Sequence, residues 1–277
     1  MQQAANRYRV NGPAALAIAC VLCAAPRAHA QIRPLNSAGV AAAHEHLVVT
    51  DQAASTAFWS ALGGTADHVG TIAGVRFPGV YILFQMNRAA APPEGSVGGV
   101  ADTIGLKVKD LAATLARVEP LGIHPEPGAS ATTASLMSPE KVRVRLVEDA
   151  TLPTEAASDE LLMKVPDPSA AAAWYAKWFG AQVVPQGQDV LAQIPGMNLR
   201  FTNVSAPAAP SHGRAFDHIG FEIANLQAFA DKLQQGGVTI NRPFGQINLG
   251  FLTAITFITD PWGTYIELNE GYVNGPK

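Results

Sequence analysis

Residues 217–226 read DHIGFEIANL and residues 102–111 read DTIGLKVKDL, so one short pattern occurs twice in the chain. Other landmarks repeat at nearly the same offset: Phe58-Trp59 with Trp174-Tyr175, and Gly64 with Gly180. Self-similarity at one fixed period indicates a duplicated unit. The two halves are therefore expected to share a fold. The copies differ most at polar positions, and these differences bear on function.

The first thirty residues have the pattern of a cleaved secretory signal. Arg7 and Arg9 give a basic start, residues 14–25 form a short apolar run, and residues 28–30 are an A-x-A cleavage site. We expect cleavage after Ala30 and a periplasmic or secreted protein. Both cysteines of the chain lie in this segment, so the mature chain has no disulfide and no thiolate ligand.

Charge and hydropathy exclude two classes of partner. Removal of residues 1–30 takes away three basic residues and no acid, which changes the net charge from −3 to about −6. No run of Lys or Arg is interleaved with aromatic residues, so a nucleic-acid partner is not expected. The apolar run in the signal is too short to span a bilayer, and no membrane partner is expected after cleavage. A small-molecule substrate is the partner that we expect.

Two β-α-β-β-β units are predicted in each half. The opening strands lie near residues 47, 103, 161 and 218, each followed by a helical segment. Residues 149–157 read as a linker between the halves. We therefore divide the chain into a signal peptide (1–30), a first domain (31–152) and a second domain (153–277). The fold class is α+β.

The opening strands alternate between apolar and polar residues. Apolar side chains on one face, such as Leu47 and Phe221, are expected to pack under the helices. The opposite face carries His44 and His46, Thr103 and Lys107, Glu160 and Lys164, and His218 and Glu222. A sheet with one polar face is wet on that side or lines a cleft. Mixed sheets curled around a cleft are predicted.

Two further segments point to a known family. Residues 216–221 read FDHIGF and residues 260–268 read DPWGTYIEL. With the four-unit plan, they make the chain from about Ala43 to Tyr272 resemble the vicinal oxygen chelate superfamily. That superfamily includes glyoxalase I, extradiol dioxygenases, and fosfomycin- and bleomycin-resistance proteins. The resemblance implies two tandem domains of this fold.

The resemblance also implies a metal site in the second half. Metal ligands of the superfamily lie at the start of opening strands and near the end of closing strands. Carried onto this chain, these places hold Glu160, His218 and Glu267, with Glu267 also in the catalytic role. One imidazole and two carboxylates suit a divalent Mn, Fe, Zn or Ni ion. Each residue has a plainer interpretation as a solvated or charged strand residue.

The matching places of the first half hold His44, Thr103 and Arg145. Thr103 is a poor ligand, and Arg145 is a fixed cation that repels a divalent ion. We therefore expect the metal site of the first domain to be degenerate. His44 and His46, two residues apart, share a face and could bind a stray ion.

Substrate contacts are expected from the polar face of the second half. Arg200, Asn198 and Tyr265 lie on strands whose polar side faces the same cleft. The planar fork of Arg200 could hold a substrate carboxylate or phosphate, or could pair with Glu222 or Glu267. His212, in a loop near His218, is either a second-layer residue of the site or a solvated one.

Two functions are compatible with these residues. The first is a metal-dependent enzyme, of lyase, isomerase or dioxygenase type, that acts on a small oxygenated substrate. Relative to extradiol dioxygenases, Glu160 replaces a His ligand and Phe257 replaces a Tyr. The alternative is a metal-free small-molecule-binding protein of the bleomycin-resistance type. The sequence leaves open whether the halves pair within one chain or across a homodimer.

Overall fold

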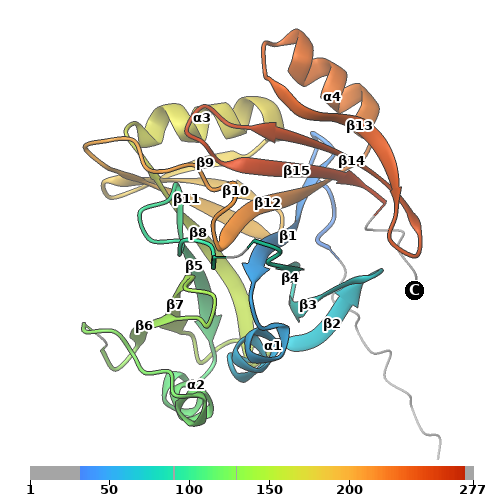
Figure 1. Ribbon diagram of the computed structural model, residues 1–277. Helices are drawn as coiled ribbons and strands as arrows, with labels where there is room; N and C mark the ends of the chain where they lie inside the picture. Colours follow the sequence, from blue (N-terminus) through green and yellow to red (C-terminus); the bar gives the residue numbers. More distant parts are fainter. Residues whose placement is uncertain (1–31, 90, 129, 272–277) are drawn as a thin grey trace, which may run out of the picture.

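The computed structural model describes residues 32–89, 91–128 and 130–271, which form four consecutive units (Figure 1). The first unit contains β1 (Val40–Val49), α1 (Gln52–Ala61), β2 (Thr65–Val69), β3 (Ile72–Phe77) and β4 (Val80–Met86). The second contains β5 (Ala101–Val108), α2 (Leu111–Val118), a 3₁₀ turn (Glu119–Leu121), β6 (Thr133–Met137) and β7 (Arg143–Glu148). The signal peptide that the sequence predicts lies outside the described residues.

The second half repeats this order. The third unit contains β8 (Ala156–Val165), α3 (Pro168–Phe179), β9 (Gln182–Gln186), β10 (Asp189–Ile194) and β11 (Met197–Asn203). The fourth contains β12 (Phe216–Ile223), α4 (Leu226–Gln235), β13 (Ile240–Asn248), β14 (Leu252–Thr259) and β15 (Tyr265–Glu270). The predicted α+β class and four-unit plan are confirmed.

The units pair in an order that their sequence positions do not reveal. The first and fourth units form an eight-stranded sheet in the order β13-β14-β15-β12-β1-β4-β3-β2. The second and third units form a seven-stranded sheet in the order β6-β7-β5-β8-β11-β10-β9. Each sheet is joined at its centre by two antiparallel opening strands, β1 with β12 and β5 with β8. The two halves therefore pair within one chain.

Helix starts show the duplication at the level of single side chains. Asp51, Asp110, Asp167 and Asn225 each precede a helix and accept a hydrogen bond from the backbone N–H three residues later. This N-cap satisfies one of the amide groups that an isolated helix end leaves without a partner. Figure 1 shows α3 and α4 at one end of the molecule and α1 and α2 at the other.

The second unit has one strand fewer than the other three among the described residues. The segment between α2 and β6 contains Pro125 and Pro127, close together. Proline lacks the N–H that a ladder hydrogen bond requires, and the N–H of Glu126, between the two prolines, donates to the carbonyl of Ser135 on β6 without a strand being formed. The seven-stranded sheet consequently ends at β6.

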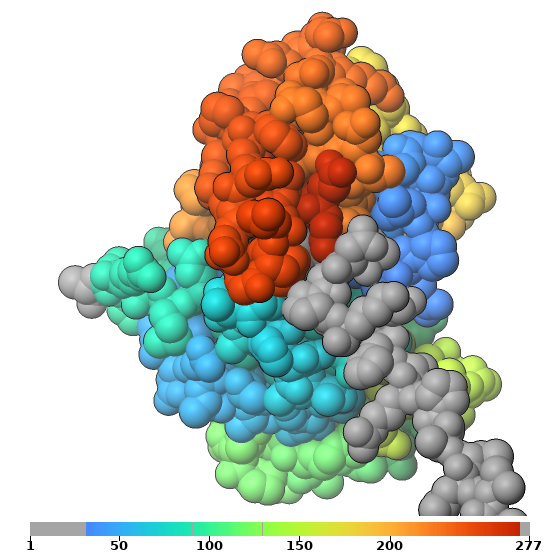
Figure 2. Space-filling model, turned by 90° about the vertical axis from the view of Figure 1, so that its right-hand side faces the viewer, coloured from blue at the N-terminus to red at the C-terminus, as the bar shows by residue number. Residues whose placement is uncertain are grey.

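The outer hairpins of the eight-stranded sheet meet each other. A Cβ atom added to Gly70, in the β2–β3 turn, would lie 1.8 Å from the carbonyl oxygen of Leu249 in the β13–β14 turn. In Figure 2 the orange-red part of the fourth unit lies against the cyan part of the first unit. The sheet is therefore curled enough to bring the hairpins at its two edges into contact. None of the described helices has the length and hydropathy needed to cross a bilayer.

Candidate metal centre

Four potential ligands converge on the cleft face of the eight-stranded sheet. His44 and His46 are two residues apart on β1, so both imidazoles lie on the same face. His46 pairs across the strands with His218 of β12. His44 pairs with Gly220, which in turn lies beside Glu267 of β15. We call His44, His46, His218 and Glu267 the His/Glu cluster.

Gly220 is the residue that allows the cluster to assemble. A Cβ atom at this position would lie 2.1 Å from Cε1 of His44. The missing side chain leaves room for the imidazole of His44 to extend across β12. Its Nε2 thereby comes within 3.5 Å of Oε2 of Glu267.

The cluster has the dimensions of a metal site. One ligand atom from each of the four residues lies within 4.8 Å of the other three. The exposed fractions are 0% for His44, 7% for His46, 3% for His218 and 7% for Glu267. The ring centroids of His46 and His218 are 4.5 Å apart, and each lies 5.6 Å from that of His44. Four buried donor groups thus converge on one place.

Asp217 orients His218 from behind. The Nδ1 of His218 donates to Oδ1 of Asp217 over 2.6 Å, and Nε2 donates to Oε2 of Glu267 over 2.9 Å. Asp217 is itself held by the backbone N–H of Gly213 at 2.6 Å. A carboxylate on one ring nitrogen fixes the orientation of the imidazole and directs the other nitrogen at a metal.

The pKa values separate the three histidines. Burial opposes protonation of His218, but hydrogen bonds to Asp217 and Glu267 outweigh it and raise its pKa to about 9. Burial lowers the pKa of His44 and, more strongly, that of His46. Although burial opposes ionisation of Glu267, hydrogen bonds from His218 and His44 hold its pKa well below its ordinary value. Two neutral imidazoles and a carboxylate are therefore ready to act as ligands at neutral pH.

The donor set fits a transition metal. Neither ring nitrogen of His46 has a hydrogen-bond partner among the described residues, although both are buried. A buried polar atom without a partner normally destabilises the folded state. A bound metal ion would be a partner for one of these nitrogens. Three imidazoles and one carboxylate suit Zn, Mn, Fe or Ni by ligand type. The residues present thus fit the divalent ion that the sequence predicts.

Comparisons with known proteins agree with this geometry. Residues 158–268 match the model of the Glyoxalase/Bleomycin resistance protein/Dioxygenase superfamily. The match covers most of the second half of the chain. The resemblance inferred from the sequence is thereby confirmed. No curated protein matches the chain.

Solved structures of the superfamily share the overall fold. Glyoxalase I from Zea mays matches with a TM-score of 0.66 at 16% identity, over 85% of this chain and 94% of that chain. The "putative dioxygenase" from Bacillus subtilis matches with a TM-score of 0.61 at 14% identity, over 87% of this chain and 86% of that chain. These matches show that the fold of this chain occurs in known structures.

The structure brings together two of the three expected ligands. His218 and Glu267 meet in the cluster, but Glu160 lies on β8, in the other sheet. Its Oε1 accepts from Arg145 and from Arg200, each at 3.2 Å. Glu160 lies away from the cluster because the third unit, which contains it, shares a sheet with the second unit and not with the fourth.

The first half supplies two residues to the cluster. We expected a degenerate site there, yet His44 and His46 take the place that we expected Glu160 to occupy. Their spacing on one strand face was a signal in the sequence. Its meaning depended on knowing that β1 pairs with β12. Thr103 and Arg145, the other first-half candidates, line the cleft of the seven-stranded sheet.

The expected substrate residues are divided between the two sheets. Arg200 and Asn198 lie on β11, where Arg200 pairs with Asp189 at 2.7 Å and Asn198 donates to the carbonyl of Asp159 at 2.7 Å. Tyr265 lies in the other sheet, opposite His218 on β15. The pairing of Arg200 with Glu222 or Glu267, which the sequence left open, is not what the structure shows.

An aromatic wall borders the cluster on one side. Tyr265 and Phe257 stack with ring centroids 4.9 Å apart, and both rings stand edge-on to His218. The ring centroids of His212 and Tyr265 are 4.1 Å apart, and Nδ1 of His212 lies 3.3 Å from Oδ2 of Asp217. Burial, with Asp217 and Glu267 nearby, raises the pKa of Tyr265. The phenol therefore stays protonated at neutral pH and can donate a hydrogen bond.

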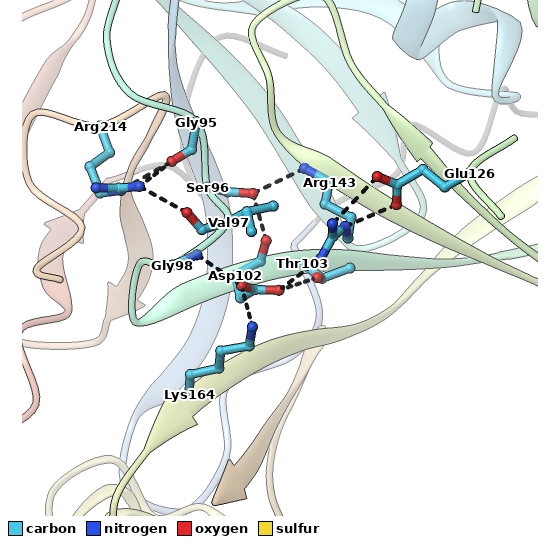
Figure 3. Close-up of polar contacts among 10 residues, drawn as sticks. All are labelled: Gly95, Ser96, Val97, Gly98, Asp102, Thr103, Glu126, Arg143, Lys164 and Arg214. Atoms are coloured by element: carbon cyan, nitrogen blue, oxygen red, sulfur yellow. Dashed lines mark hydrogen bonds and ion pairs between the residues drawn. The ribbon is translucent and has the colours of Figure 1, made fainter. Parts of the chain in front are cut away.

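The other sheet has the same supporting loop with a different charge pattern (Figure 3). Asp102 accepts from the backbone N–H of Gly98, as Asp217 does from Gly213. Its neighbour, however, is Thr103, whose hydroxyl donates over 2.7 Å, and Lys164 supplies an ion pair at 2.7 Å. The carboxylate that orients an imidazole in one sheet therefore neutralises a lysine in the other.

Proposed function

We propose that the protein is a metal-dependent enzyme of the vicinal oxygen chelate superfamily that acts at the His/Glu cluster. The observation that carries the proposal is the convergence of four buried ligand atoms within 4.8 Å of one another. The substrate class is a small molecule with two adjacent oxygen atoms. The family match and the glyoxalase I and dioxygenase neighbours support this class of chemistry.

His44, His46, His218 and Glu267 would hold the ion. A bound divalent ion would act as a Lewis acid toward the two adjacent oxygens of a substrate. Asp217 keeps Nδ1 of His218 occupied, so that Nε2 points into the cluster. Tyr265 and Phe257 present aromatic surface beside His218, where an organic substrate could pack and water would be excluded.

We assign the catalytic role to Glu267. It is the carboxylate of the cluster, and His218 and His44 favour its ionised form. In that form its oxygens can accept a proton from substrate as well as bind a cation. Asn269 donates to its other oxygen, Oε1, which restricts the rotation of the carboxylate. Lyase, isomerase and dioxygenase reactions on vicinal oxygens are the reactions to screen.

Metal analysis of three proteins tests the proposal. The mature chain from Gln31, purified without chelators, should contain near-stoichiometric Mn, Fe, Zn or Ni. Glu267→Ala removes a ligand and should lower the affinity for that metal at least about a hundredfold. Glu160→Gln is the matched control, because it removes a carboxylate from the equivalent cleft of the other sheet.

The control distinguishes the ligand set seen in the structure, which lacks Glu160, from the set predicted from the sequence, which includes it. Loss of metal in Glu160→Gln, or full retention in Glu267→Ala, would contradict the proposed centre. Absence of metal from the wild type, even after the four ions are added back, would favour the metal-free binding protein. In that case the cleft should be screened for bound small molecules.

We further propose that the protein is exported. The basic start, short apolar run and A-x-A site of residues 1–30 support this location. The intact mass of the protein recovered from the periplasm or medium should correspond to a chain that begins at Gln31. A full-length chain retained in the cytoplasm would contradict export and leave the metal proposal unaffected.

A further inference from the structure

The cleft of the seven-stranded sheet holds a separate pocket of about 340 Å³. Its lining includes Thr103, Arg145, Glu160, Leu162, Asp189 and Arg200. We call it the arginine pocket. It lies at the place in its sheet that the His/Glu cluster occupies in the other, between two antiparallel opening strands. A volume of this size admits a small organic molecule.

The pocket has more hydrogen-bond donors than acceptors left for a ligand. Both oxygens of Glu160 already accept from guanidinium groups, at 3.2 Å from Arg145 and at 3.2 and 3.4 Å from Arg200. Arg200 also donates to Asp189. Arg145 donates to Glu160 alone among the described residues, and a guanidinium has five N–H groups. The pocket therefore offers more unused donors than unused acceptors.

Neighbouring cations are committed to other partners. Arg143, two residues before Arg145 on β7, donates to Glu126 and lies 3.9 Å from Asp102 (Figure 3). Lys164 pairs with Asp102 at 2.7 Å. The side chain of Arg145 is by contrast 42% exposed. Arg145 is thus available to a ligand, and it lines the pocket, whereas Lys107, 40% exposed and 3.5 Å from Asp159, does not.

We propose that the arginine pocket binds a small organic anion through its carboxylate, with Arg145 as the anchor. A guanidinium presents two parallel N–H groups that match the two oxygens of a carboxylate. Arg200, held by Asp189 and Glu160, forms the opposite wall. The formal charges of the two arginines and two acids cancel, so long-range attraction is weak. Affinity therefore depends on the paired hydrogen bonds from the Arg145 guanidinium to the carboxylate, and a millimolar dissociation constant is expected.

Malonate is a suitable probe, because it is small, anionic and carries the required group. Titration of malonate into the mature protein should give saturable binding by calorimetry at constant ionic strength. In ¹⁵N NMR spectra the amides of Gly105 and Thr202, which line the pocket, should shift. Arg145→Gln should weaken binding at least about tenfold, the equivalent of one lost charge-assisted pair.

Arg117→Gln is the matched control. Arg117 is also a partly exposed arginine with one carboxylate neighbour, Glu155, but it lies on α2 outside the pocket. Arg145→Lys keeps the charge without the fork and should also weaken binding, by a smaller factor. Equal malonate affinity in wild type and Arg145→Gln, or no saturable binding by the wild type, would overturn the proposal.

Malonate could also bind a metal, so the titration is repeated in His218→Ala. Unchanged affinity in this variant is expected, because His218 lies in the other sheet. Loss of binding in His218→Ala together with retention in Arg145→Gln would place the anion at the His/Glu cluster and overturn the arginine pocket. The outcome for the pocket is thus independent of the outcome for the metal centre.

Discussion

The two sheets have the same plan at their centres, yet one assembles metal ligands and the other assembles ion pairs. Strand registers define the equivalent positions: His46 with Leu162, His44 with Glu160, His218 with Thr103, and Glu267 with Arg145. In the eight-stranded sheet these positions carry three imidazoles and one carboxylate. In the seven-stranded sheet the carboxylate of Glu160 stands at the place of His44 and the guanidinium of Arg145 at the place of Glu267, and no imidazole remains among the four.

This comparison shows how a duplicated frame can separate two kinds of recognition. A buried cluster of three imidazoles and a carboxylate favours a compact divalent ion. Fixed guanidinium groups repel such an ion and favour an anion. Because the backbone registers are the same, the difference in charge between the two sites lies in their side chains. The predictions below test this equivalence position by position.

The largest effect is expected at a core position, Glu45, whose equivalent is Leu161. Burial raises the pKa of Glu45 from its ordinary 4.5 to about 8. At about 1.4 kcal/mol per pKa unit the full shift corresponds to roughly 5 kcal/mol, and relaxation of the core reduces it. We therefore expect Glu45→Leu to raise the free energy of unfolding by on the order of 3 kcal/mol at pH 8.

The direction in which the stability difference between wild type and Glu45→Leu changes with pH is a sharper test than the size of that difference. Below about pH 4.5 the carboxyl is protonated in both the folded and the unfolded chain, so ionisation contributes no penalty. Between pH 4.5 and 8 only the unfolded chain releases the proton, and wild-type stability falls relative to the variant. Urea unfolding of wild type, Glu45→Leu and Glu45→Gln across this range measures the difference. A gap that stays constant with pH would show that Glu45 is ionised in the fold.

A smaller effect is expected from the two supporting aspartates. Asp217→Asn removes the charge that orients His218 and should weaken metal binding about tenfold to a hundredfold. It should also lower the pKa of His218 from about 9 in metal-free protein, because Asp217 is one of the two carboxylates that raise it. Calorimetry and NMR titration of the imidazole measure the two quantities.

Asp102→Asn is the matched control for this experiment. It changes the equivalent loop carboxylate in the other sheet, where the partners are Thr103 and Lys164. Stability should fall, since Lys164 loses its buried partner, but metal affinity should not change. Similar losses of metal affinity in the two variants would mean that the aspartates act through the fold and not through His218.

The local features of this fold could be predicted from the sequence, whereas the pairing of its units could not. Strand faces follow from period-two alternation, and helix starts follow from caps such as Asp51 and Asp167. Whether β12 pairs with β1 or with β8 depends on contacts between segments far apart in the chain. That one unknown decided whether His44 or Glu160 would stand beside Gly220. His218 and Glu267 could be predicted because β12 and β15 belong to the same unit.

The smallest effect tests the space beside the two central glycines, Gly220 and Gly105. Gly220→Ala would place a Cβ 2.1 Å from the buried ring of His44, so the imidazole must move away from Glu267. At Gly105 the overlap is smaller, because the nearest atoms are Cγ of Glu160 at 2.8 Å and the backbone oxygen of Glu160 at 3.0 Å. We expect Gly220→Ala to cost about 1–2 kcal/mol of stability and to weaken metal binding several-fold. Gly105→Ala should cost less and leave metal affinity unchanged. Metal affinity that is unchanged in Gly220→Ala would mean that His44 is not a ligand and that His46, His218 and Glu267 form the centre alone.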